Sequence, residues 1–257
     1  MNDLALAKRV FSCIDNTTLN ATDNQASVEA FCRRIRELTL ADGTHVAAVC
    51  VYPPFVAVAK QVLEGSGIKV ASVAGAFPHG QLPIELRVAE VKYAVDQGAD
   101  EVDVVINRGL LLAGDDDDAV RDEVAAMKEA CSGRILKVIL ETGELPSPAL
   151  VTRATQVAIA GGADFVKTST GKIATGATLE AAEWMLNGVK ENVKINIKKV
   201  GFKAAGGIST PEEAVAYASL AKKVMGDNYI NCQTFRIGAS RLTERLHSFL
   251  TFQTAVN

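Results

Sequence analysis

The sequence predicts an α/β protein with a (β/α)8 TIM barrel fold and an extra N-terminal helix, and three observations point to this fold. Apolar, β-branched runs alternate with amphipathic segments that have the length of crossover helices. The apolar runs are continuous, which is typical of parallel strands covered on both faces. About eight such units fit within the 257 residues, as a barrel requires. A doubly wound open sheet would give a similar pattern and remains the alternative.

Two helices are expected before the first strand. The segment LALAKRVFSCI (4–14) has a helical pattern, and a second one covers residues 23–38 (DNQASVEAFCRRIREL). Because both precede the first predicted strand, they would cover the bottom or the side of the barrel.

The remaining elements alternate along the chain. Strands are predicted at residues 45–52, 69–77, 101–107, 135–142, 164–170, 199–206, 222–226 and 234–240, of which 222–226 (KKVMG) has the weakest pattern. Helices are predicted between strands at residues 83–98, 118–131, 147–162 and 210–223. Ser147 before Pro148 and Thr210 before Pro211 mark two helix starts, because a hydroxyl caps the first turn and proline fits there.

Composition and charge limit the function classes. No linker divides the chain, so one domain over residues 1–257 is expected. The net charge of -3 gives no electrostatic basis for binding nucleic acid or an anionic membrane, and no signal peptide or transmembrane run is visible, so we expect a cytoplasmic protein. The five cysteines are not paired as CxxC and the three histidines are far apart. We therefore expect no disulfide framework, no metal and no cofactor.

Polar side chains occur late in several predicted strands, where a packed wall would be apolar. In a parallel barrel the C-terminal strand ends converge on the active site, so these side chains would share one mouth. They are Cys50, Asp103, Lys137, Glu141, Lys167 and Lys203.

Two of these lysines suit covalent catalysis. Burial and a neighbouring cation both favour the neutral amine, and Lys167 would have Lys203 on the next strand. A neutral amine can attack an aldehyde and form an imine, which accepts electrons when a carbon–carbon bond breaks. Asp103 could then move protons. The alternative is structural: a salt-bridged Lys167, a buried pair of Asp103 with Lys203, and a pair of Lys137 with Glu141.

Three strand ends predict anion binding. TSTGK, AAGGIST and IGASR combine glycine with small hydroxyl residues where a strand turns into a helix. Backbone amides at such turns bind phosphate, and barrels often place this site after their last strands. Gly-Gly also serves tight turns, so each motif alone is weak evidence.

The motifs EVDVV, LKVILETGEL, DFVKTSTGK, VGFKAAGG and IGAS, in this order, resemble the deoxyribose-phosphate aldolase family, and FPHG, AAVCVYPP and DNTTLN extend the resemblance over nearly the whole chain. The resemblance implies a class I aldolase without metal or organic cofactor. Such an enzyme reversibly cleaves 2-deoxy-D-ribose 5-phosphate to acetaldehyde and D-glyceraldehyde 3-phosphate, in deoxyribose phosphate catabolism. A homodimer would be the commonest assembly.

The resemblance also implies residue roles. The Schiff-base lysine falls on Lys167, the activating lysine on Lys203 and the proton-relay aspartate on Asp103, the three residues chosen above from strand position. Asp15 would join the polar network, and Cys50 matches a cysteine sensitive to excess aldehyde. The implied phosphate pocket consists of Thr170, Lys172, Gly206, Gly207, Ser209, Gly238 and Ser240.

The chain departs from the family pattern at three points. Arg241 replaces a serine of GASS, Ser209 follows GGI where some bacterial members carry arginine, and no tyrosine follows Tyr229. These departures leave the phosphate contacts and tail-assisted proton transfer open, but not the imine chemistry. Two other functions stay open as well: another phosphate-binding barrel aldolase or isomerase, and a catalytically silent sugar-phosphate sensor.

Overall fold

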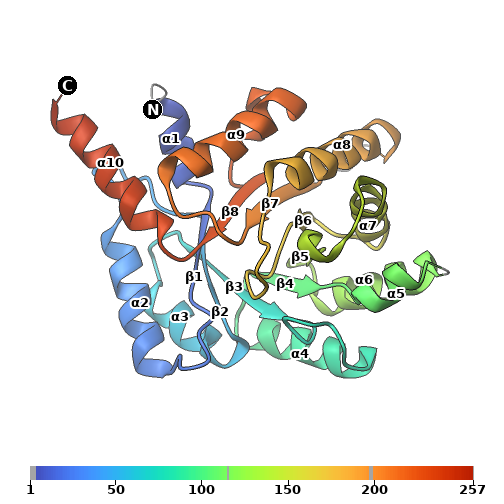
Figure 1. Ribbon diagram of the computed structural model, residues 1–257. Helices are drawn as coiled ribbons and strands as arrows, with labels where there is room; N and C mark the ends of the chain where they lie inside the picture. Colours follow the sequence, from blue (N-terminus) through green and yellow to red (C-terminus); the bar gives the residue numbers. More distant parts are fainter. Residues whose placement is uncertain (1–3, 115, 197–198, 257) are drawn as a thin grey trace.

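The computed structural model describes residues 4–114, 116–196 and 199–256. The ends of the domain expected from the sequence, Met1 and Asn257, lie outside these residues. The described chain forms a closed barrel in which β1 to β8 are parallel and pair in sequence order, with β8 closing against β1 (Figure 1). This confirms the TIM barrel and removes the open sheet as an alternative.

The strands are short and the helices lie outside them. The strands are β1 (Ile14–Thr17), β2 (Ala48–Val51), β3 (Lys69–Ala74), β4 (Glu101–Val105), β5 (Ile135–Ile139), β6 (Phe165–Lys167), β7 (Gly201–Ala205) and β8 (Phe235–Ala239). The α-helices are α1 (Leu4–Phe11), α2 (Gln25–Glu37), α3 (Val56–Val62), α4 (Ile84–Asp96), α5 (Arg108–Ala113), α6 (Asp117–Ala130), α7 (Pro148–Ala160), α8 (Leu179–Asn196), α9 (Pro211–Met225) and α10 (Leu242–Val256). Short 3-10 turns are η1 (Pro53–Phe55), η2 (Thr142–Glu144) and η3 (Asp227–Tyr229).

One predicted strand was wrong, one strand was missed, and the helix expected at residues 23–38 is present but follows that missed strand. The first strand is β1, and residues 23–38 contain α2, which follows β1 as an ordinary barrel helix. Segment 222–226 is not a strand but the end of α9. Asp15 and Asn16 give β1 no apolar run, while Ala218 and Ala221 continue the buried face of α9 up to its last turn.

The extra N-terminal helix is present. α1 packs against α9 and α10 on the outside of the barrel, and Figure 1 shows it beside these two helices, where the chain begins. Its buried residues include Val10 and Phe11, which lie on its apolar face. The helix ends at Phe11 rather than at residue 14, because Ile14 already belongs to β1.

Each strand has two buried faces, one toward the helices and one toward the barrel axis. In β4, Val102 and Val104 belong to the large apolar cluster between the strands and the helices. Their neighbours Glu101 and Asp103 are equally buried but polar. Because successive side chains of a strand point to opposite faces, the polar ones face the barrel axis. The barrel interior next to β4 therefore contains charged side chains.

The predicted helix starts are confirmed by their caps. The Ser147 hydroxyl accepts a hydrogen bond from the N–H of Leu150 at the start of α7. The Thr210 hydroxyl accepts one from the N–H of Glu213, and the Glu213 carboxylate reaches back to the Thr210 N–H. This capping box fixes the start of α9, directly after the loop that follows β7.

In the part of the chain that the structure describes, no helix combines the length and the apolar character needed to cross a membrane.

Candidate active site

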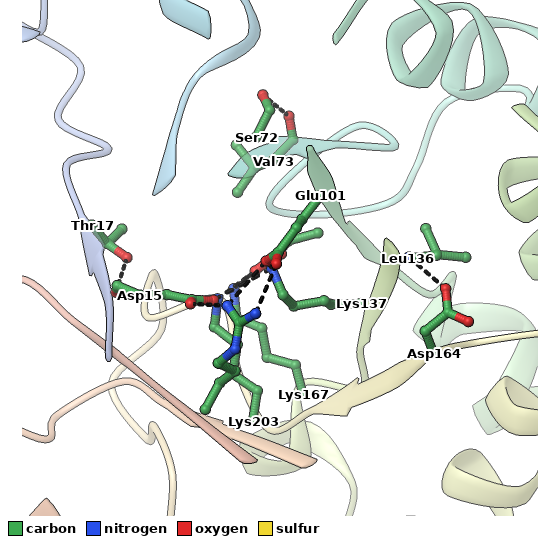
Figure 2. A network of polar contacts seen from close by, with 12 residues as sticks. Asp15, Thr17, Ser72, Val73, Glu101, Leu136, Lys137, Asp164, Lys167 and Lys203 are labelled. Carbon is green, nitrogen blue, oxygen red and sulfur yellow. Dashed lines mark hydrogen bonds and ion pairs between the residues drawn. The ribbon is translucent and has the colours of Figure 1, made fainter. Parts of the chain in front are cut away.

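Three residues predicted to be catalytic meet inside the barrel. Asp103 on β4 accepts hydrogen bonds through Oδ2 from Lys167 Nζ and from Lys203 Nζ, both at 2.8 Å. The lysines are register partners on β6 and β7, so their side chains extend side by side. Figure 2 shows both directed toward the same point near Asp15 and Glu101. A single carboxylate oxygen thus bridges the two lysines.

A second set of ion pairs surrounds this bridge. Lys137 on β5 binds Asp103 Oδ1 at 2.9 Å and Glu101 Oε2 at 2.5 Å. Lys203 also binds Asp15 Oδ2 at 2.5 Å. Asp15 is therefore part of the polar network. Lys137 does not pair with Glu141, so that structural alternative was wrong.

Arg236 completes the network, and the sequence analysis missed it. Its Nη1 lies 2.5 Å from Asp15 Oδ1, and its Nη2 lies 2.7 Å from Glu101 Oε1. Glu101 was missed as well. A signal was available, because Glu101 and Arg236 lie two positions before Asp103 and Gly238 and therefore face the same side of their strands.

Burial and charge move the pKa of Lys167 downward. Loss of solvent is the largest cause and favours the neutral amine, and the ammonium of Lys203 acts in the same direction, while Asp103 opposes both. The side chain is only 5% exposed. A neutral amine at Lys167 is what nucleophilic attack requires.

The surrounding groups stay charged. Burial would lower the pKa of Lys203, but Asp103 and Asp15 raise it above its ordinary value. Burial would raise the pKa of Asp103, but Lys137, Lys167 and Lys203 together hold it well below its ordinary value. Around Lys167 lie three basic side chains, Lys137, Lys203 and Arg236, which form ion pairs with three acidic ones, Asp15, Glu101 and Asp103.

An open pocket of about 320 Å³ leads to Lys167. This volume suits a small ligand. Asp103, Lys203, Asp15 and Cys50 are buried beside or beneath it and do not line it. The lining includes the predicted residues Lys167, Thr170, Lys172, Gly206, Gly207, Ser209, Gly238 and Ser240. It also includes Arg241, whose contact with the phosphate the sequence left open, and Thr17, Thr18, Leu19 and Asn20, which sequence reasoning had not placed there.

Two glycines shape the pocket wall after β7. Gly206 and Gly207 have φ values of 92° and 86°, a conformation that side chains rarely adopt. A Cβ on Gly206 would lie 3.0 Å from the Cα of Gly176, so the loop after β6 could not pass this close. Without a side chain at Gly206, the two loops lie close enough for the Gly206 carbonyl to accept a hydrogen bond from the N–H of Ala177 at 3.0 Å. The loops after β6 and β7 are therefore joined at Gly206.

Gly238 makes room for Lys203. A Cβ at this position on β8 would lie 3.0 Å from Lys203 Cε and 2.9 Å from Ala205 Cβ. Gly238 lines the pocket as predicted, and it also leaves the space in which the Lys203 side chain reaches Asp103.

Ser209 is less available for a ligand than the sequence suggested. Its N–H donates to Glu213 Oε2 at 2.8 Å, as does the N–H of Thr210 at 2.9 Å. The amides at the start of α9 are thus occupied by the protein's own carboxylate. Arg241, in contrast, is exposed and lines the pocket.

Cys50 lies on β2 in a small apolar cluster with Leu19, Ala71 and Val73. Burial, with a contribution from Asp103, raises the pKa of its thiol to about 11. The thiol therefore stays protonated at neutral pH and is a weak nucleophile there.

No group of three or more His, Cys, Asp or Glu side chains is arranged to hold a metal ion in the described ranges of the chain.

Comparison with known proteins agrees with this geometry. The model of the DeoC/LacD family of aldolases matches residues 9–232. A Caenorhabditis elegans protein, provisionally named a deoxyribose-phosphate aldolase, is 44% identical over 240 residues, which make up 92% of this chain and 79% of that protein.

Two solved structures have the same fold. The apo form of a provisionally named deoxyribose-phosphate aldolase from Toxoplasma gondii has a TM-score of 0.86 and 25% identity, and the match covers 97% of this chain and 98% of that one. The tetrameric deoxyribose phosphate aldolase from Aeropyrum pernix has a TM-score of 0.75 and 27% identity, covering 97% of each chain. The chain thus belongs to the DeoC/LacD family of aldolases.

Proposed function

We propose that this aldolase is a class I enzyme that reversibly cleaves 2-deoxy-D-ribose 5-phosphate to acetaldehyde and D-glyceraldehyde 3-phosphate. The observation that carries the proposal is the amine of Lys167, which lines an open pocket and whose pKa is lowered by burial and by Lys203. The family relationship supports the aldol chemistry, and the relatives named above support the substrate.

Lys167 is the proposed nucleophile. Its neutral amine attacks the C1 aldehyde of the open-chain sugar, and loss of water gives an imine whose nitrogen, once protonated, withdraws electrons. The bond between C2 and C3 then breaks. Its electron pair forms the enamine, and the C3 hydroxyl loses a proton and becomes the aldehyde of D-glyceraldehyde 3-phosphate. Protonation of the enamine at C2 and hydrolysis release acetaldehyde and restore the amine.

Asp103 is the proposed proton relay, and Lys203 is the proposed activating lysine. Asp103 Oδ2 touches both lysine nitrogens, so it links the reacting nitrogen to an ammonium that holds its proton firmly. Since the lysines keep Asp103 ionised, it acts on protons through its hydrogen-bonded partners and through water. Asp15 fixes Lys203 from the other side.

The proposed phosphate site is the far end of the pocket. Gly206, Gly207 and Gly238 have no side chain there and Ser240 has a small one, so backbone groups can approach an anion closely. Lys172 supplies positive charge, and Arg241 adds a second cation where many family members have serine. Phosphate binding at this end would leave C1 free to reach Lys167.

The first test traps the imine. We expect acetaldehyde followed by borohydride to add C2H4 to the peptide that carries Lys167, with no addition when borohydride is omitted. Lys167→Arg is the matched control, since it keeps the cation but cannot form the imine. An adduct on other lysines alone, or none on folded protein, would contradict the proposal and favour a non-covalent aldolase, an isomerase or a binding protein.

The second test concerns the phosphate. Unphosphorylated 2-deoxyribose should be cleaved with a kcat/KM at least about 100-fold lower, because binding energy from the phosphate is lost in the transition state. Equal kcat/KM for the two sugars would remove the phosphate site from the proposal. Ligand binding without turnover of either sugar would favour the sugar-phosphate sensor.

A further inference from the structure

Glu141 is a buried carboxylate that contacts the loop after β6. It follows β5 and its side chain is fully buried. Oε1 accepts the N–H of Thr170 at 3.1 Å, and Oε2 accepts the Thr170 hydroxyl at 2.5 Å. Both oxygens of the carboxylate therefore bind the same residue.

The contact continues from Thr170 to Lys172. The Thr170 hydroxyl has one proton, which it donates to Glu141, and its oxygen accepts the N–H of Lys172 at 3.0 Å. The Lys172 ammonium in turn donates to the carbonyl of Leu19, on the loop after β1. Thr170, Lys172 and Leu19 all line the pocket. A continuous chain of hydrogen bonds thus runs from Glu141 to the pocket wall.

The backbone conformation of Glu141 is unusual for a residue with a side chain, which indicates that the carboxylate has a role at this position. Its φ of 56° and ψ of 59° lie in the left-handed region, where non-glycine residues are strained. Glycine would adopt this conformation without strain, but it would offer no carboxylate. The hydrogen bonds from Thr142 N to Thr168 O and from Glu144 N to Glu141 O, both at 2.9 Å, hold the backbone in place. Strain at such a position points to a function.

The Glu141 carboxylate binds the loop after β6 and, among the described residues, takes no part in the ion-pair network of the barrel. Among the ion pairs of residues 4–114, 116–196 and 199–256, none includes Glu141, whereas Lys137, four residues earlier on β5, is bound to Glu101 and Asp103. Within the part of the chain that the structure describes, the Glu141 carboxylate accepts its hydrogen bonds from the N–H and O–H of Thr170. A buried charge held in this way fixes its partner firmly.

We propose that Glu141 is a positioning residue for the substrate phosphate. It orients the Thr170 hydroxyl and the Lys172 backbone, so that the loop after β6 keeps the shape of the phosphate pocket. Glu141 does not touch the reacting carbons and acts through Thr170. The inference rests on the proposed function, since it assumes that the pocket binds a phosphorylated sugar.

The test compares two sugars in two variants. Glu141→Gln keeps the size of the side chain and Glu141→Ala removes it. For 2-deoxy-D-ribose 5-phosphate we expect KM to rise by about tenfold or more, as expected for loss of one charge-assisted hydrogen bond. The kcat/KM for unphosphorylated 2-deoxyribose should stay within about twofold of wild type. Borohydride trapping of acetaldehyde on Lys167 should also be unchanged.

Thr170 provides matched controls that do not alter Glu141. Thr170→Val removes the hydroxyl and should reproduce the rise in KM, while Thr170→Ser keeps the hydroxyl and should show a clearly smaller rise. The double variant Glu141→Gln with Thr170→Val should lose no more than the larger single effect, because both break one chain of contacts. If the Glu141 variants do not fold, the two Thr170 variants alone decide the question.

A merely structural role gives a different result. Equal losses for both sugars, or a Thr170→Val variant with wild-type KM, would overturn the positioning role. If wild-type protein cleaves neither sugar, the proposed function fails by itself. Binding of inorganic phosphate, measured by calorimetry on wild type and Glu141→Gln, then tests the inference: weaker binding by the variant supports it and equal binding overturns it.

Discussion

Lys167 and Lys203 have the same side chain and occupy paired positions on neighbouring strands, yet their pKa values move in opposite directions. Both lose solvent and both bind Asp103 Oδ2. Lys203 has Asp15 as a second carboxylate, whereas Asp103 is the carboxylate among the largest influences on Lys167, where Lys203 itself is a neighbouring cation. One additional aspartate therefore separates the proposed nucleophile from the proposed activating lysine.

This asymmetry predicts the effect of Lys203→Leu. Removing the neighbouring ammonium raises the pKa of Lys167, so the rising limb of kcat/KM against pH should move to higher pH, and the rate at neutral pH should fall by about 100-fold or more. Lys203→Arg keeps the cation and should keep the limb near its original position. The pH profile of the three proteins is the measurement, and a Lys203→Leu profile that matches wild type would refute the activating role.

Arg241 is the residue-level departure from the family pattern with the clearest expected effect. Arg241→Ser should raise KM for the phosphorylated sugar by about twofold to fivefold, as for an exposed ion pair. Arg241→Lys retains the charge and should have a smaller effect. Because salt screens exposed charges, the difference should shrink between low and high ionic strength. A KM that is the same in all three proteins at low salt would show that Arg241 does not contact the phosphate.

At the scale of the elements, the meeting of Asp103, Lys167 and Lys203 could be predicted because each is a polar residue on a strand with a clear apolar pattern. β1 could not, since Asp15 and Asn16 leave no apolar run and its partners lie on β2 and β8, far along the chain. Arg236 and Glu101 were missed although the alternation along β8 and β4 marks them as inward-facing. They face the barrel axis, but only the closed barrel brings β4, β8 and β1 close enough for their ion pairs.

The start of α9 offers a test of element stability. Thr210→Ala removes the hydroxyl that caps the Glu213 N–H and should lower the free energy of unfolding by about 1 kcal/mol. Thr210→Ser keeps the cap and should cost much less. Urea denaturation of the three proteins provides the measurement. A Thr210→Ala midpoint equal to wild type would show that the rest of the capping box is sufficient.

At the scale of the whole molecule, the buried charges connect β1, β4, β5, β6, β7 and β8. Asp15, for example, binds both Lys203 and Arg236, each at 2.5 Å. Breaking such a network by removing one partner leaves buried cations unpaired. Asp15→Asn should therefore lower the free energy of unfolding by about 3 kcal/mol or more at neutral pH, measured by urea denaturation.

The same substitution should change the response to acid. Burial would raise the pKa of Asp15, but Lys137, Lys203 and Arg236 lower it below its ordinary value. Its contribution to stability is therefore complete above the unfolded pKa of about 3.9 and is lost as pH falls further, through the folded pKa. The stability difference between wild type and Asp15→Asn should be constant above about pH 5 and shrink below about pH 4. A difference that grows in acid would contradict this.

The assembly in solution is a further property of the whole molecule. A homodimer stays our prediction from the sequence, and its mass would be twice the chain mass of 27.2 kDa. Sedimentation equilibrium would measure it. A mass four times that of the chain would instead match the tetramer described for the Aeropyrum pernix relative.

The charged barrel interior also limits how the protein can be engineered. A common route to heat-tolerant enzymes replaces buried ion pairs with well-packed apolar side chains, which often costs nothing and can add stability. Here that route would remove the proposed catalytic groups or the carboxylates that hold them, because Asp103, Lys167 and Lys203 belong to the same network. Selection for a more robust biocatalyst should therefore favour changes in the outer helices and loops, and leave the inward-facing positions of β4 to β8 and β1 unchanged.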